Sequence, residues 1–264
     1  MIMFNYLRKI LSLTMLLICS YEDIRKREID DKIWIIFSPI GILITFIEFF
    51  FKFIDFSYLI FYILSIIIAI IVSIIIYYSK FVGGADSKAL ITLSFLDPIN
   101  LNKNIIHPFN SIIVLTNSCI ISLIIPFSIF IYNLYRILNK EKIFEGFENE
   151  KIYRKIFALF IGYKTKNIKK RFATSIEKKI NNKKKFVFSL LENEIEFIED
   201  KDIWVTPSIP LIVFLLFGYI ISIIYGDILK IFILNIKNLF LKNRNICFRR
   251  IIFSFNFLNI LIFI

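Results

Sequence analysis

Two aspartates lie just beyond long apolar runs of the sequence. Asp23 follows the first run, and Asp86 follows the third, directly after Gly83 and Gly84 and one small residue. Two carboxyl groups that come within a few ångströms of each other cannot both ionise easily, so one keeps its proton while the other is charged. The charged member can activate a water molecule while the neutral member polarises a carbonyl. Such a pair can hydrolyse a peptide bond without a metal ion or a nucleophilic side chain.

Both aspartates also have a purely structural interpretation. Asp23 can pair with Arg27 one helical turn later, and Asp86 can be the N-cap of a helix that begins at Ser87. In the catalytic interpretation, the glycines before Asp86 allow a sharp bend and the close approach of an extended substrate strand. The residue types alone leave both interpretations open.

Long apolar segments must position these carboxylates. A transmembrane helix needs roughly 20 apolar residues, and five segments meet this length. The segments are Met3 to Tyr21, Ile33 to Phe51, Phe56 to Ser79, Ser111 to Tyr135 and Ile203 to Gly226. The first contains Arg8 and Lys9, which can snorkel toward water, and the second contains Glu48. A sixth candidate, Ala85 to Leu96, rises only about 18 Å as a helix. The sequence therefore predicts an all-α polytopic membrane protein with about six transmembrane helices.

The number of crossings predicts where the two aspartates lie. Two crossings separate Asp23 from Asp86, and an even number returns the chain to the same side of the membrane. Basic residues are concentrated in the connections 22 to 32, 80 to 88 and 136 to 202. Because basic connections stay in the cytoplasm, we expect both carboxylates at the cytoplasmic face of the cell membrane. The first run also resembles a secretory signal peptide, but no small-residue cleavage site follows it.

One segment has the composition of a soluble domain. We expect a membrane domain over 1–135, a small cytoplasmic α+β or β-rich domain over 136–202, a last transmembrane helix over 203–230, and a C-terminal extension of unknown role over 231–264. Alternating residues predict a hairpin between Lys185 to Leu190 and Glu194 to Phe197. The basic run from Lys164 to Lys185 fits a solvated face, and it equally fits contact with anionic lipid or an acidic partner.

Other chemistries lack the residues that they need. His107 is the single histidine and stands beside a proline in a polar connection, and the three cysteines (Cys19, Cys119 and Cys247) are widely scattered. We therefore expect no metal site, no disulfide framework and no cofactor. The net charge of +12 reports membrane topology here and does not imply a nucleic-acid partner.

The motifs around the two aspartates resemble those of a known family. Asp23-Ile24 with Arg27 and Ile29, and Gly83-Gly84-Ala85-Asp86 with Lys88, are similar to the two motifs of archaeal preflagellin peptidases and type IV prepilin peptidases, which are GxGD-type intramembrane aspartic proteases. Two further segments are similar to the archaeal branch, namely Leu159 to Lys164 and Ile203 to Pro210 leading to Tyr225-Gly226-Asp227.

This resemblance implies a fold and an activity. It implies six spans, a cytoplasmic domain before the last span, and Asp23 and Asp86 as the catalytic residues. Gly83, Gly84, Arg27 and Lys88 would bind the substrate or support the site. The expected activity is an aspartic endopeptidase that removes the short basic leader of preflagellin (archaellin) or type IV pilin-like precursors at the cytoplasmic face. Its partners would be that precursor and the lipid bilayer.

The sequence departs from the family pattern at several points. Ala85 stands where GxGD has its second glycine, and Asp30 stands where proline is common. The four-cysteine module of bacterial prepilin peptidases is absent, which disfavours a bifunctional bacterial-type enzyme.

Two other classes of protein stay open. One is a transporter that uses Asp23, Glu48 and Asp86 along an ion pathway, and the other is a non-catalytic assembly scaffold that docks a partner on its basic domain.

Overall fold

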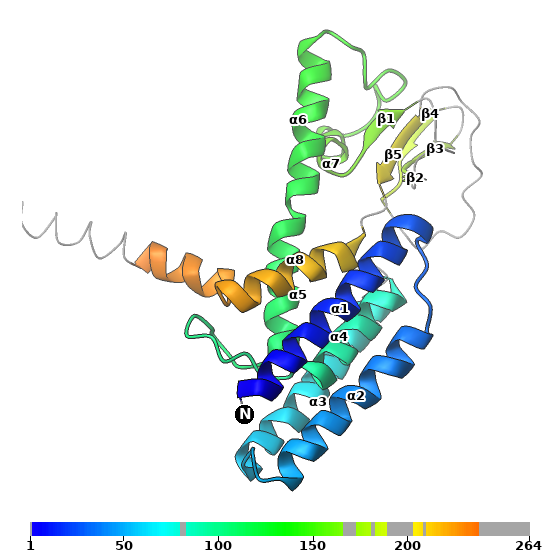
Figure 1. The fold of residues 1–264 in the computed structure, drawn as a ribbon. Helices are drawn as coiled ribbons and strands as arrows, with labels where there is room; N and C mark the ends of the chain where they lie inside the picture. Colours follow the sequence, from blue (N-terminus) through cyan, green and yellow to red (C-terminus); the bar gives the residue numbers. More distant parts are fainter. Residues whose placement is uncertain are drawn as a thin grey trace, which may run out of the picture.

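The computed structural model describes residues 2–79, 83–165, 173–180, 183–188, 203–207 and 210–237. Four helices come first, and they form a bundle (Figure 1). They are α1 (Ile2–Lys26), α2 (Lys32–Phe50), α3 (Phe56–Ser79) and α4 (Gly84–Leu96). Then follow α5 (Asn110–Ser122), α6 (Ile124–Leu138), α7 (Ile152–Ile161), β1 (Tyr163–Thr165), β2 (Ala173–Ser175), β3 (Glu177–Ile180), β4 (Lys183–Phe186), β5 (Ile203–Pro207) and α8 (Leu211–Ile224).

Four helices of the described chain are long and apolar enough to cross a membrane. They cover Met3–Lys26, Lys32–Phe50, Phe56–Tyr78 and Asn110–Leu138, the last comprising α5 and α6. The pair Leu211–Ile224 and Ile228–Lys237, bent by 58°, passes the same criteria when taken together. The structure therefore supports a mostly helical, multi-pass membrane protein with four spans, or five with the bent pair. The expected six spans are not confirmed.

Two of the six predicted spans are not confirmed, each for an identifiable reason. The expected span from Ile203 to Gly226 is not one helix, because Ile203–Pro207 forms strand β5 and α8 begins only after Pro210. Trp204, Val205 and Thr206 favour a strand, and the prolines flank the break between strand and helix. The sixth and shortest candidate, Ala85 to Leu96, becomes α4, a helix of 13 residues.

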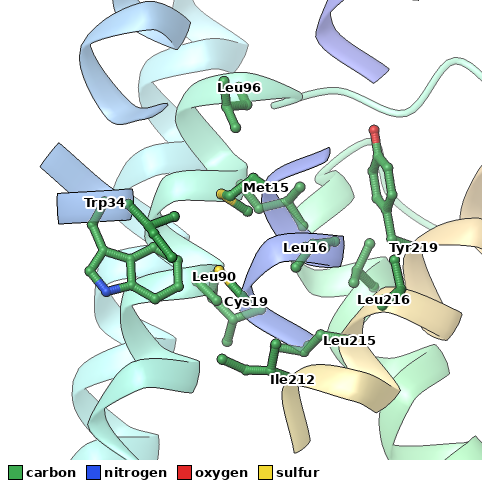
Figure 2. Packing of buried hydrophobic residues seen from close by; sticks show 14 residues of the cluster. Met15, Leu16, Cys19, Trp34, Leu90, Leu96, Ile212, Leu215, Leu216 and Tyr219 are labelled. Atoms are coloured by element: carbon green, nitrogen blue, oxygen red, sulfur yellow. The ribbon is translucent and has the colours of Figure 1, made fainter. Parts of the chain in front are cut away.

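Helix α4 lies inside the bundle, where other helices surround it. It packs against α1, α2, α3, α5 and α8, and its buried residues include Ser87, Thr92 and Ser94 as well as leucines. A helix enclosed by other helices needs no lipid-facing apolar surface, so its polarity is tolerated. Figure 2 shows the core around it, where Cys19 of α1 lies next to Leu90, and Ile212 and Leu215 of α8 lie close by.

Two glycines allow neighbouring helices to approach closely. A Cβ atom on Gly41 of α2 would come within 2.5 Å of the Phe95 carbonyl oxygen of α4. A Cβ atom on Gly218 of α8 would overlap Ser118 and Val114 of α5. Small residues at such contacts let the helix backbones pack directly against each other, which is a common way to hold membrane helices together.

A buried ion pair fixes the end of the bundle where α1 begins. The Arg8 guanidinium lies 2.6 Å from the Glu48 carboxylate, and both side chains are almost fully buried. Arg8 also donates to the Thr45 hydroxyl and to the Leu96 carbonyl at the end of α4. The expectation that Arg8 snorkels to water is therefore wrong, because its charge is neutralised inside the bundle by a partner 40 residues away. This pairing also explains how α1 and α2 accommodate these charges.

The strands form a small sheet outside the bundle, with α7 beside it (Figure 1). The order in the three-stranded sheet is β1-β5-β2, and both pairs are antiparallel, with Tyr163 opposite Val205 and Ser175 also opposite Val205. Strands β3 and β4 make a separate two-stranded ribbon. Trp204, Phe147 and Phe186 form the core of this domain together with residues of α7. This domain is the strand-containing region that the sequence predicts before the last helix.

The structure describes only part of the expected hairpin. Strand β4 pairs with the preceding strand β3, so that Lys185 lies opposite Lys178. The predicted second arm, Glu194 to Phe197, lies outside the described residues, as does much of the basic run after Lys164. Residues 238–264 of the C-terminal extension also lie outside them.

Candidate active site

The periodicity of α1 places Asp23 on its buried face. Ser12, Leu16 and Cys19 are fully buried, and Asp23 continues this stripe one helical turn beyond Cys19. The helix itself runs to Lys26, five residues beyond the apolar run. The half-buried Asp23 carboxylate is therefore held on a rigid helix at the end of the bundle.

Helix α4 likewise places Asp86 on its buried face. Leu93 and Leu90 belong to the common core with Cys19, and Asp86 lies one turn before Leu90. Since α4 runs opposite to α1 (Figure 1), a step forward from Cys19 and a step back from Leu90 lead to the same end of the bundle. The two aspartates thus end two facing stripes, and this end faces the sheet.

The Asp86 side chain accepts a backbone hydrogen bond at the start of its own helix. Its Oδ2 accepts a hydrogen bond of 3.1 Å from the Gly83 backbone N–H, as the third residue of a helix often does for the residue before it. The expectation that Asp86 is an N-cap of a helix starting at Ser87 is wrong, because α4 already begins at Gly84. The carboxyl group is buried, with 9% of the residue exposed.

The electrostatics of Asp86 couple it to Asp23. Burial raises the pKa of Asp86 to about 7, the negative charge of Asp23 acts in the same direction, and the bond from Gly83 acts against both. Asp86 lies on α4, which is not one of the four helices long and apolar enough to cross a membrane. The charge of Arg27 attracts the Asp23 carboxylate. Near neutral pH, Asp86 is therefore the member of the pair that holds a proton.

The supporting residues lie around this pair in different ways. Arg27 ends α1 in a left-handed conformation, with a φ of 59°, and its N–H donates to the Asp23 carbonyl at 3.1 Å. A non-glycine residue in this region costs about 1–2 kcal/mol. Lys88 binds Asp31 at the start of α2, with 2.6 Å between Nζ and Oδ1, and both side chains are exposed. In this structure Lys88 therefore joins α4 to α2.

The two glycines are not required by the backbone that the structure describes. Gly83 has a φ of −70° and a ψ of 157°, which any residue can adopt. A Cβ atom on Gly84 would meet the Tyr77 ring at 3.6 Å, an ordinary contact. A Cβ atom on Gly83 would lie only 3.3 Å from Oδ2 of Asp86, so the carboxylate itself leaves little room there. A requirement for glycine at Gly84 would come from something that approaches this backbone from outside.

A second polar cluster at the opposite end was not predicted. The buried Asp97 accepts hydrogen bonds of 2.8 Å from both the Asn110 amide and the Tyr219 hydroxyl. Arg8, Glu48 and Asp97 also line a small hollow there. The sequence signal for this cluster was a set of isolated polar residues within or beside apolar runs. These bonds tie α4, α5 and α8 together, far along the bundle from Asp23.

The fold and the site define a multi-pass membrane protein with two carboxyl groups at one end of its helix bundle. Comparison with known proteins agrees with this description. The model of the type IV leader peptidase family matches residues 10–127, which include both aspartates, and that of the archaeal peptidase A24 C-terminus type II matches residues 153–228. The chain belongs to the type IV leader peptidase family.

Individual relatives match over most of their length. The preflagellin peptidase of Methanococcus maripaludis is 31% identical over 229 residues, which cover 80% of this chain and 92% of the relative. Those of Methanocaldococcus jannaschii and Methanococcus voltae are each 27% identical over 232 and 231 residues, covering 80% of this chain and 91% and 92% of the relatives. These findings support a leader peptidase function.

Proposed function

We propose that the protein is a membrane aspartic endopeptidase that removes the leader of a preflagellin-like precursor at the cytoplasmic face of the cell membrane. The observation that carries this proposal is the coupled pair Asp23 and Asp86, which end facing stripes of α1 and α4 and interact through their charges. The names of the relatives, preflagellin peptidases, support the choice of substrate.

The proposed mechanism divides the work between the two carboxyl groups. The ionised Asp23 takes a proton from a water molecule as the water oxygen attacks the scissile carbonyl carbon. The neutral Asp86 donates its proton to the carbonyl oxygen, which gives a tetrahedral diol. As the C–N bond breaks, Asp23 gives its proton to the leaving nitrogen and Asp86 regains its proton from the diol.

The remaining site residues are proposed to position these two groups. Arg27 attracts the Asp23 carboxylate through its positive charge. The N–H of Gly83 holds one oxygen of Asp86 at 3.1 Å, which orients the carboxyl group. Gly84 leaves open backbone beside it, where an extended peptide can lie close. The Lys88–Asp31 pair holds the start of α2 against α4.

The transporter hypothesis loses one of its expected acids. Glu48, which would serve an ion pathway in that hypothesis, is bound to Arg8 in a buried pair. Its charge is therefore already compensated. No observation on the described residues favours a second function over the peptidase.

Cleavage of a preflagellin by membranes that contain the protein tests the proposal. We expect wild type to cut, and Asp23→Asn and Asp86→Asn each to abolish cutting, because asparagine nearly keeps the shape but cannot ionise. Asp55→Asn is the matched control, since this exposed aspartate lies before α3 at the other end of the bundle. Cutting at the same site by either catalytic variant would refute the two-aspartate mechanism.

A further inference from the structure

Helix α7 carries an apolar stripe that stays largely exposed, although the Phe157 ring contacts the Phe188 ring edge-on with 4.9 Å between the centroids. Ile152 is 76% exposed, Tyr153 63%, and Ile156 and Phe157 50% each. In a helix of 3.6 residues per turn these positions share one face. A contiguous apolar face of this kind marks a contact with another molecule or with a membrane.

The other face of α7 fixes its orientation. Ala158 and Leu159 are buried in the domain core with Trp204 and Phe186. Arg154 binds the carbonyl oxygen of Phe186. Because these contacts hold the helix, it cannot turn its apolar stripe inward, and the stripe is a fixed feature of the folded domain.

The stripe continues the surface of a membrane-spanning helix. The Phe160 ring, in the middle of the stripe, stacks on Phe130 of α6 with 4.2 Å between the ring centroids, and it also meets Phe127. The Asn133 amide of α6 donates to the carbonyls of Leu159 and Gly162 at 2.9 and 2.7 Å.

These partners on α6 belong to the candidate span Asn110–Leu138, and Figure 1 shows α7 beside α6. The span is itself apolar on its open side, since Phe127 and Ile131 are 56% and 64% exposed. The stripe and the lipid-facing side of this span therefore form one continuous surface.

Basic side chains border the stripe. Lys155 lies beside the stripe, with its ammonium group 5.9 Å from the centre of the Phe144 ring. Arg154 is directed into the domain, where it binds the Phe186 carbonyl oxygen and pairs with Glu150. Lys151 precedes the helix, with its ammonium group 5.8 Å from the centre of the Tyr153 ring. An apolar face that includes aromatic residues and has lysine at its edge is typical of helices that lie in the membrane interface.

We propose that α7 lies in the membrane interface, with its apolar stripe among the lipid acyl chains and the exposed Lys151 beside the phosphates of anionic lipids. Lipid is the occupant because the stripe is continuous with a spanning helix that already faces lipid. The domain is then held down on the membrane surface by α7 as well as by its connections to α6 and α8.

Spin labels on the full-length protein test this placement. In a background with Cys19, Cys119 and Cys247 replaced by serine, Ile156→Cys is labelled with a nitroxide and reconstituted into vesicles of phosphatidylcholine and phosphatidylglycerol. We expect collisions with oxygen, which is lipid-soluble, to exceed those with a water-soluble nickel complex. Tyr153→Cys should behave in the same way. Asn149→Cys, at an exposed polar position before the helix, is the matched control and should show the reverse order.

Two results would overturn the proposal. If the label at Ile156 meets the nickel complex as often as the label at Asn149 does, the stripe lies in water. If the label at Ile156 is shielded from both reagents, protein covers the stripe, and dipolar broadening between labels then shows whether that protein is a second copy. The measurement needs no catalytic turnover, so its outcome is independent of the proposed peptidase activity.

Discussion

Cleavage should decline as the pH rises through about 7, because the proposed mechanism needs a proton on Asp86. The pKa of this buried carboxyl is raised from 3.8 to about 7, a shift worth about 4 kcal/mol in favour of the neutral form. An aspartate in water would be protonated about a thousandfold less often at pH 7. Above pH 7 the protonated fraction of Asp86, and with it the rate, should drop about tenfold for each pH unit.

The assay is the initial rate of precursor cleavage at low substrate concentration, measured with purified protein in vesicles from about pH 5 to about pH 9. Under these conditions the profile reports groups of the free enzyme. The direction follows from the raised pKa: the required neutral form exists below pH 7 and is lost above it. A rate that stays constant or increases between about pH 7 and about pH 9 would refute the assignment of Asp86 as the proton donor.

A chemical probe can check the same pKa without turnover. A hydrophobic carbodiimide modifies neutral carboxyl groups, so the labelling of Asp86 should decrease through about pH 7 in wild type. In Asp23→Asn the decrease should move to lower pH, because the neighbouring charge that raises this pKa is gone. Asp55→Asn should leave the midpoint unchanged. An unchanged midpoint in Asp23→Asn would show that the two carboxyl groups are not coupled.

Three substitutions separate the roles of other residues. Gly84→Ala should leave the thermal stability unchanged, since the added methyl group makes only an ordinary contact. It should nevertheless reduce cleavage of the precursor, chiefly by raising KM. Normal cleavage would show that no substrate lies against this backbone. Glu48→Gln should destabilise the protein by about 3–5 kcal/mol in thermal unfolding, because it leaves the buried Arg8 without its anion, and an unchanged Tm would contradict the buried pair. Asp31→Asn should cost only about 0–1 kcal/mol, because its pair with Lys88 is exposed, and a large loss of stability would show that this contact is buried in the membrane.

The location of the two aspartates could be predicted from the sequence, because it depends only on where each lies relative to the apolar runs. Asp23 and Asp86 each follow an apolar run, and the direction of the helices then places both at one end of the bundle. The role of Asp86 in its own helix was not predictable in the same way. Whether α4 starts at Gly84 or at Ser87 depends on which backbone N–H donates its hydrogen bond to the Asp86 carboxylate. The two possibilities differ by one helical turn, and the residue types leave them undecided.

The errors in the predicted fold come from counting apolar residues without knowing their neighbours. Ile203 to Pro207 has the hydropathy of a membrane helix, but its partners in the sheet, such as Tyr163 and Ser175, lie about 30 to 40 positions away and decide its structure. Arg8 illustrates the same limit. Its anion lies 40 residues away on another helix, so the sequence suggests exposure where the structure has a buried pair.

The strand order also constrains how the protein can be made. Strands β1 and β2 both pair with β5, which is synthesised about 30 residues after β2 and directly before α8. Until the ribosome has produced Ile203–Pro207, the two earlier strands lack the partner that joins them, and the domain cannot close. Translation therefore delivers α1 to α6 to the membrane well before the domain completes its fold, and a chain that stops at residue 202 would retain both aspartates while leaving its sheet without a centre.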